Sequence, residues 1–125
     1  MAIRYLTDRK RAQGLGAGRE GTHHHWQMMA SSTALVFLVP LLVFVFGFAL
    51  GGTHEEVLAY FSHPFTAIAM GLSLSVCIIH MMREALAAVE DYVHGVAGKL
   101  TLMAVTALSY TLIATALFAL AKIAL

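Results

Sequence analysis

Three long stretches of the chain consist almost entirely of apolar side chains and carry no charged residue. They run from 28 to 52, from 65 to 82 and from 100 to 121. At about 1.5 Å of rise per helical residue, each is long enough to cross a hydrocarbon core of about 30 Å. The pattern predicts an all-α integral membrane protein with a single membrane-anchor domain over residues 1–125 and spans at 28–51, 64–88 and 100–121.

Two prolines and one amphipathic segment refine this pattern. Pro40 falls inside the first span and predicts a kink there. Pro64 is expected in the first turn of the second span, where its missing N–H costs little. Between these spans, "HEEVLAYF" predicts a short interfacial helix with Tyr60 and Phe61 at the level of the lipid headgroups.

The few charged residues indicate an orientation. They make up 12% of the chain, about half the usual share, and a net charge of +1 gives no case for a nucleic-acid partner. Arginine and lysine gather before the first span and in the second loop, whereas the first loop has only Glu55 and Glu56. The positive-inside rule therefore places the N-terminus in the cytoplasm and the C-terminus outside, with residues 1–26 as a cytoplasmic arm.

The arm contains two patterns that resemble ligand sites. "GLGAGREG" at 14–21 is glycine-rich, but no Lys-Ser/Thr and no preceding strand accompany it, so a flexible or partner-ordered segment is favoured over a phosphate loop. The three histidines at 23–25 cannot all face one ion on a helix, which favours surface or interface positions. The single cysteine, Cys77, excludes a disulfide framework.

The second span has two unlike faces. Helical steps of about 100° place small or polar residues near His80 and bulky apolar residues opposite. The first set is Ser73, Cys77, Glu84, Ala87 and Asp91, and the second is Leu72, Leu74, Ile78, Met82 and Leu86. Because small residues let another helix or a flat ligand approach closely, we expect the His80 face to point inward. The bulky face would meet lipid or a neighbouring helix.

His80 is the candidate for chemistry, because an ionisable residue at this depth in a span is a functional candidate by default. Three interpretations stay open: a hydrogen bond to a Ser or Thr of a neighbouring helix, a proton relay, or ligation of a metal, best haem iron. No second histidine lies within a span. A haem with two histidine ligands would therefore take the other one from a different chain.

Asp91 and Tyr92 follow about 16 Å further along the helix, and Asp91 returns to within about 20° of the His80 face. We expect both residues at or just beyond the cytoplasmic surface. A phenol can donate to a carbonyl oxygen, and a carboxylate beside it can orient a donor or pass protons. Each residue alone is more often interfacial or solvated, but together they suit the reduction of a quinone.

The segment "HMMREALAAVEDYVHG", residues 80–95, resembles the second-span signature of the small hydrophobic membrane anchor of succinate dehydrogenase, respiratory complex II, in its bacterial form. That signature is a His, then after eleven residues an Asp with an adjacent Tyr, here His80, Asp91 and Tyr92. "GLGAGREGTHHHW", which leads into the first span, is similar to the same family. The number of spans, the orientation and the length also agree.

The resemblance implies a membrane anchor of succinate:quinone oxidoreductase in the bacterial inner membrane, with no catalysis of its own. His80 would be one axial ligand of a haem b shared with a cytochrome b-type subunit, and the two chains would each form half of a larger anchor bundle. Tyr92 would donate to a quinone carbonyl and Asp91 would support the protons of that site. FAD and iron–sulfur clusters would belong to the flavoprotein and iron–sulfur subunits of the complex.

Two positions depart from the family pattern. Glu84 stands where relatives usually have a small residue, and its charge should repel haem propionates unless it is paired, for which Arg83 is a candidate. Ser31 stands where relatives tend to have an arginine, so no haem or quinone contact is carried over from the first span. Trp26 is expected to pack at the interface.

Two alternatives remain beside the succinate dehydrogenase anchor. The anchor of a fumarate reductase would serve the reverse reaction. A small non-redox membrane accessory or assembly protein would use His80 for packing alone.

Overall fold

The computed structural model describes residues 7–14 and 21–125, and these residues form five helices and no strand. The helices are α1 (Asp8–Gln13), α2 (Gly21–Ala49), α3 (His54–Ser62), α4 (Pro64–Tyr92) and α5 (Gly95–Ala124). Three of them, α2, α4 and α5, are long and apolar enough to cross a membrane. The prediction of an all-α protein with three membrane-spanning helices is confirmed, while most of the glycine-rich segment, residues 15–20, lies outside the described residues.

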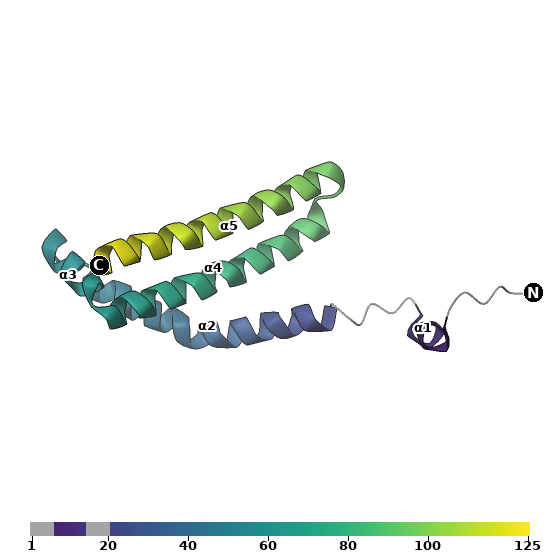
Figure 1. The fold of residues 1–125 in the computed structure, drawn as a ribbon, viewed down its shortest axis with the longest axis horizontal. Helices are drawn as coiled ribbons and strands as arrows, with labels where there is room; N and C mark the ends of the chain where they lie inside the picture. Colours follow the sequence, from purple (N-terminus) through teal and green to yellow (C-terminus); the bar gives the residue numbers. More distant parts are fainter. Residues whose placement is uncertain (1–6, 15–20) are drawn as a thin grey trace, which may run out of the picture.

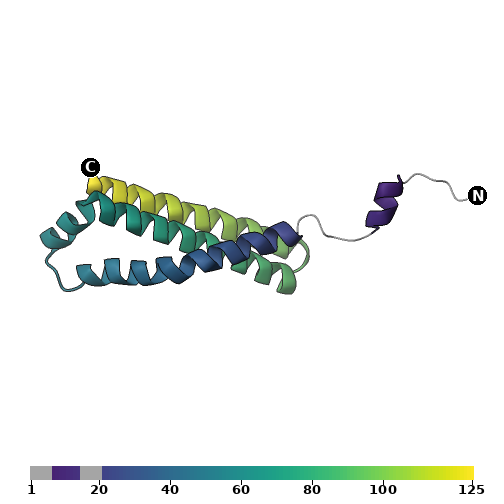
Figure 2. The same cartoon turned by 90° about the horizontal axis from the view of Figure 1, so that it is seen from below.

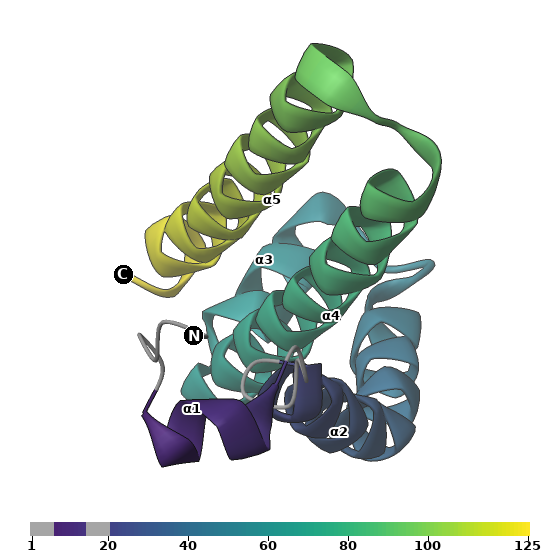
Figure 3. The ribbon, with the colours of Figure 1, turned by 90° about the vertical axis from the view of Figure 1, so that its right-hand side faces the viewer.

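The three long helices form one layer with α4 in the middle (Figures 1 and 3). α4 packs against both α2 and α5, whereas the backbones of these two flanking helices do not approach each other closely. α3 closes the end where α2 and α5 finish and α4 begins, which we call the α3 end. At the opposite end, the His94 end, α2 begins and His94 lies between α4 and α5. The open layer leaves large apolar surfaces for lipid or other subunits.

Local sequence explains where these helices begin. Pro64 is the first residue of α4, as predicted. α3 begins with a capping box, in which the Thr53 hydroxyl accepts from the Glu56 N–H while the Glu56 carboxylate accepts from the Thr53 N–H at 2.8 Å. The backbone N–H of Thr53 and then its hydroxyl hold the pKa of Glu56 below its ordinary value. The predicted short helix between the first two spans is therefore present and firmly capped.

Pro40 lies inside α2, which remains helical on both sides of it. α2 changes direction along its length (Figure 2). A proline cannot donate to the carbonyl four residues earlier, and its ring crowds that carbonyl, so Pro40 is the physical cause available for the bend.

The core lies at the α3 end of the layer. Val45 of α2 and Ala69 and Met70 of α4 are buried there, and partly buried aromatic and aliphatic side chains pack around them. The rings of Tyr60 and Phe61 meet edge to face with centroids 5.2 Å apart. These two residues of α3 therefore contribute to packing within the chain in addition to the interfacial position that we predict for them.

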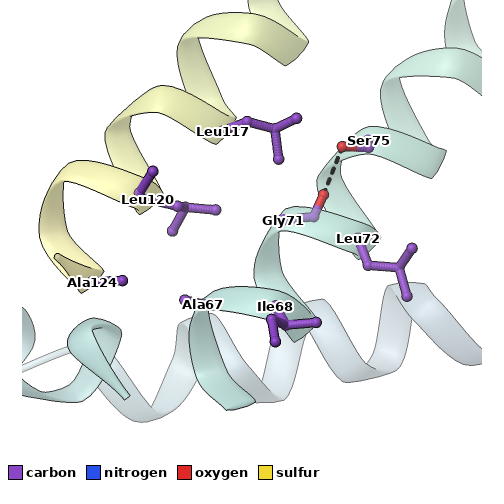
Figure 4. A pocket seen from close by; sticks show the side chains of 9 residues that line it. Ala67, Ile68, Gly71, Leu72, Ser75, Leu117, Leu120 and Ala124 are labelled. Atoms are coloured by element: carbon purple, nitrogen blue, oxygen red, sulfur yellow. Dashed lines mark hydrogen bonds between the residues drawn. The ribbon is translucent and has the colours of Figure 1, made fainter. Parts of the chain in front are cut away.

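α4 and α5 approach closely at Gly71. A Cβ at this position would lie 3.3 Å from Cδ2 of Leu117 and 3.4 Å from Cδ1 of Leu120. A groove of about 440 Å³ runs along this contact, and Figure 4 shows the leucines of α5 pointing across it toward Gly71. The Ser75 hydroxyl donates back to the Gly71 carbonyl at 2.7 Å, so the groove presents little polarity of its own.

Burial distinguishes the two predicted faces of α4 only in part, because each face has both buried and exposed residues. Ser73 on the His80 face is fully buried, but Glu84 and Asp91 on the same face are exposed. On the bulky face Met82 is buried and Leu72 is 55% exposed. The difference follows from the middle position of α4, which packs against α2 on one side and α5 on the other, with α3 near its beginning.

Candidate functional site

His80 lies on α4 and connects it to α2. Its Nδ1 atom is 2.9 Å from the hydroxyl oxygen of Ser31, a residue 49 positions earlier in the chain. Only 14% of its side-chain surface is exposed. Its other ring nitrogen, Nε2, lies 3.7 Å from Oε1 of Glu84, whose side chain is 55% exposed. The imidazole is therefore held on one side by α2 and presents Nε2 toward the more open side.

Ser31 is itself anchored to the backbone of α2, in the N-terminal half of that helix. Its hydroxyl donates to the carbonyl oxygen of Met28 at 3.0 Å. The result is a chain of polar contacts from the second membrane-spanning helix to the backbone of the first. In a hydrocarbon environment such contacts satisfy groups that water cannot reach.

A groove of about 590 Å³ lies beside this contact, between the beginning of α2 and the last third of α4. Met28 and Glu84 line it, as do several polar residues of α2, namely His24, His25, Ser32 and Thr33. The groove opens on the surface of the chain, so a ligand placed there would also meet lipid or another chain.

The remaining histidines do not assemble a metal site. All six are exposed, and His23 makes a side-chain contact of 2.8 Å with Gln27 one turn later. Within residues 7–14 and 21–125, no three His, Cys, Asp or Glu side chains come together as ion ligands. His80 is thus the one partly buried histidine, as predicted, and it can supply one bond to a metal whose other ligands come from elsewhere.

Asp91 and Tyr92 lie at the end of α4, at the His94 end of the layer. α4 continues unbroken from His80 to Tyr92. Asp91 therefore lies on the same face of the helix as His80, about 16 Å further along the axis. Asp91 is exposed and Tyr92 is 85% exposed. Neither makes a hydrogen bond or ion pair with another described residue, so both are available to a ligand or partner.

Two further predicted residues have less defined surroundings. Arg83 is partly buried and forms no ion pair with any residue that the structure describes, Glu84 included. Trp26 is 67% exposed, which suits a position against lipid or a partner. Their proposed roles stay predictions.

The residue that the sequence interpretation missed is Ser31. It was noted only because relatives tend to have an arginine there, and no haem or quinone contact was carried over from the first span. The sequence did offer a signal, since a hydrogen bond from His80 to a Ser or Thr of a neighbouring helix was one of three interpretations. The polar cluster "SST" at 31–33 stands alone in an apolar stretch, but only the packing of α2 on α4 selects Ser31 from it.

The hydrogen bond of His80 does not use up both of its ring nitrogens. An imidazole has two nitrogens, so a bond from Nδ1 to Ser31 leaves Nε2 for a ligand. The hydrogen-bonding and ligation interpretations of His80 are therefore compatible.

Comparison with known proteins identifies the family. Residues 4–121 match the family described as succinate dehydrogenase/fumarate reductase transmembrane subunit. The chain is also 38% identical over 123 residues to the succinate dehydrogenase hydrophobic membrane anchor subunit of Paracoccus denitrificans, covering 98% of this chain and 95% of that protein. No solved structure matches it. The chain belongs to the succinate dehydrogenase/fumarate reductase family, as a multi-pass membrane anchor subunit of this oxidoreductase complex.

Proposed function

We propose that this anchor shares a haem b with a cytochrome b-type subunit through His80, and that Tyr92 and Asp91 form part of a quinone-reduction site. The observation that carries the proposal is the geometry of His80. Its Nδ1 is bonded to Ser31, while Nε2 lies next to an exposed carboxylate on the open side of the helix pair. A histidine that is fixed through one nitrogen and accessible through the other is the usual form of a haem ligand.

The surroundings of His80 fit a haem that is completed by a partner. The chain offers a single partly buried imidazole, so the second axial ligand would come from the cytochrome b-type subunit. The groove between α2 and α4 reaches Glu84 but is not lined by His80, so the space for the haem would be formed together with the partner chain. Glu84 would have to give up its contact with Nε2, and Arg83, one residue away, is the candidate to balance its charge or that of a propionate.

The quinone site would lie at the His94 end of the layer. Quinone reduction consumes two electrons and two protons. The iron–sulfur subunit would supply the electrons, and the aqueous phase would supply the protons. Tyr92, exposed at the end of α4, would donate a hydrogen bond to a quinone carbonyl. Asp91 is the residue next to Tyr92, and its side chain is exposed. Its carboxylate would orient charged neighbours and exchange protons with water.

The charge pattern supports a specific placement in the cell. The His94 end is flanked by the basic N-terminal segment, so we place it in the cytoplasm and α3 outside, in a bacterial inner membrane. The flavoprotein and iron–sulfur subunits would dock at the cytoplasmic end and carry FAD and the iron–sulfur clusters. A fumarate reductase anchor would have the same arrangement, whereas family membership disfavours a non-redox accessory protein.

The test is a spectroscopic comparison of purified complexes. The complex is isolated with its partner chains, and its dithionite-reduced spectrum and low-spin haem signal are recorded. A b-type haem is expected, and His80→Ala should remove the low-spin signal of a haem with two histidine ligands. His63→Ala is the control, because His63 is exposed at the α3 end. A complex without haem, or an unchanged low-spin signal in His80→Ala, would refute the proposal.

A further inference from the structure

Ser31 has two polar neighbours, the Met28 carbonyl oxygen at 3.0 Å and Nδ1 of His80 at 2.9 Å. A carbonyl oxygen can only accept, so in this geometry the single hydroxyl hydrogen of Ser31 goes to Met28. With the hydrogen so placed, the Ser31 oxygen accepts from Nδ1 of His80. This arrangement places the proton of a neutral imidazole on Nδ1 and leaves the lone pair on Nε2.

The bond has an electronic consequence as well as a geometric one. An imidazole that donates from Nδ1 becomes more electron-rich at Nε2, and the bond also fixes the rotation of the ring. A more basic axial ligand favours ferric over ferrous haem. Ser31 is therefore placed to influence how strongly His80 binds iron and how readily that iron is reduced.

We infer that Ser31 of the first membrane-spanning helix is a positioning residue for the haem ligand, which selects the Nδ1–H form of His80 and lowers the midpoint potential of the haem. The inference rests on the proposed haem ligation by His80. It assigns a role to a helix from which no haem contact was expected.

Neighbouring residues show that this contact is more than ordinary bonding of polar side chains to their own helix. The Ser32 hydroxyl donates to the same Met28 carbonyl at 2.8 Å, and the Thr33 hydroxyl donates to the carbonyl of Met29 at 2.9 Å. Both side chains are exposed and neither reaches another helix. Ser31 alone of the three is partly buried and bonded to α4.

The test is a redox titration of the haem in the purified complex. Ser31→Ala removes the acceptor. Loss of such an outer-shell partner typically weakens metal binding by about tenfold or more, and we expect a loss of about tenfold to fall on the ferric haem, which lowers the preference for ferric over ferrous haem by the same factor. Tenfold corresponds to a rise of about 59 mV for one electron. Ser32→Ala is the matched control, because it removes a bond to the same carbonyl without touching His80.

Two further substitutions keep the test decisive where Ser31→Ala lowers the yield of the complex. Ser31→Thr retains the hydroxyl and should keep the wild-type potential, whereas Ser31→Cys, with a weaker acceptor of similar size, should raise it. If Ser31→Ala and Ser31→Cys both have the potential of Ser32→Ala, the inference is wrong. In that case the proposed function still holds where haem binding depends on His80. Where haem binding does not depend on His80, both the role of Ser31 and the proposed haem ligation are wrong.

Discussion

The two flanks of α4 are held by different physical means. On the α2 flank, a hydrogen bond of 2.9 Å joins His80 to Ser31. On the α5 flank, Gly71 lets Leu117 and Leu120 approach the backbone of α4. One flank thus contains a directional polar contact, and the other consists of close apolar packing.

The comparison shows how one helix can serve two purposes. Between helices in lipid, close packing of small residues stabilises association without specifying any chemistry. A polar contact adds modest stability, typically about 0.6 kcal/mol, but it fixes the orientation and tautomer of a side chain. We therefore expect changes on the α5 flank to affect stability and changes on the α2 flank, together with the His94 end, to affect redox function.

The largest effect is expected at the His94 end. Tyr92→Phe removes the phenolic donor from an exposed site and should reduce quinone reductase turnover by about 10²-fold, the usual cost of losing one donor to developing negative charge. Haem content should not change. Tyr110→Phe, at a position that is 58% exposed on α5, is the control. Turnover of the Tyr92→Phe complex equal to that of the control would remove Tyr92 from the quinone site.

An intermediate effect is expected on the α5 flank. Gly71→Leu places a large side chain where even a Cβ would touch two leucines, so unfolding in detergent should be easier by about 1–3 kcal/mol. The haem spectrum of the folded complex should stay the same. The matched control is Gly47→Leu in α2, because nothing lies within 4 Å of a Cβ built there. Equal melting temperatures for the two variants would show that close packing at Gly71 does not stabilise the pair of helices.

The smallest effect is expected at α3, which belongs to neither flank. Thr53→Ala removes the N-terminal cap of this helix and should weaken it by about 1 kcal/mol, visible as faster amide hydrogen exchange in its first turn. Thr111→Ala is the control, because that exposed hydroxyl bonds only within α5. Unchanged exchange in Thr53→Ala would mean that packing alone maintains α3.

The same cap should respond to pH. The pKa of Glu56 is lower in the folded chain than in the unfolded chain. The ionised carboxylate therefore stabilises α3 fully above the ordinary glutamate pKa, and this stabilisation is lost as the pH falls from the ordinary pKa to the lowered pKa. Acidification over that range should therefore lower the protection of the first-turn amides of α3 in the wild type, measured as exchange relative to the intrinsic rate at each pH. The Thr53→Ala variant, which lacks half of the box, should respond less.

The sequence allowed most of the fold to be predicted, and three of the four residues that make up the candidate site. Long uncharged stretches, Pro64 and the segment before it indicated all three spans and α3, because helix length and burial in lipid depend on local composition. His80, Asp91 and Tyr92 were predicted as site residues from their spacing on one helix, and their roles stay predictions. Ser31 was not predicted, because a contact between residues 49 positions apart depends on how two helices pack.

By itself, the sequence determined that this protein is a three-span helical anchor of the succinate dehydrogenase/fumarate reductase family, since hydrophobic length and a short motif are properties of neighbouring residues. Only the tertiary structure decided that α4 lies in the middle of an open layer and that α2 reaches His80 through Ser31. The physical reason is that lipid tails are as apolar as the side chains of the helices, so the hydrophobic effect does not distinguish one neighbouring helix from another. The choice of neighbour therefore depends on close packing and on single hydrogen bonds between helices.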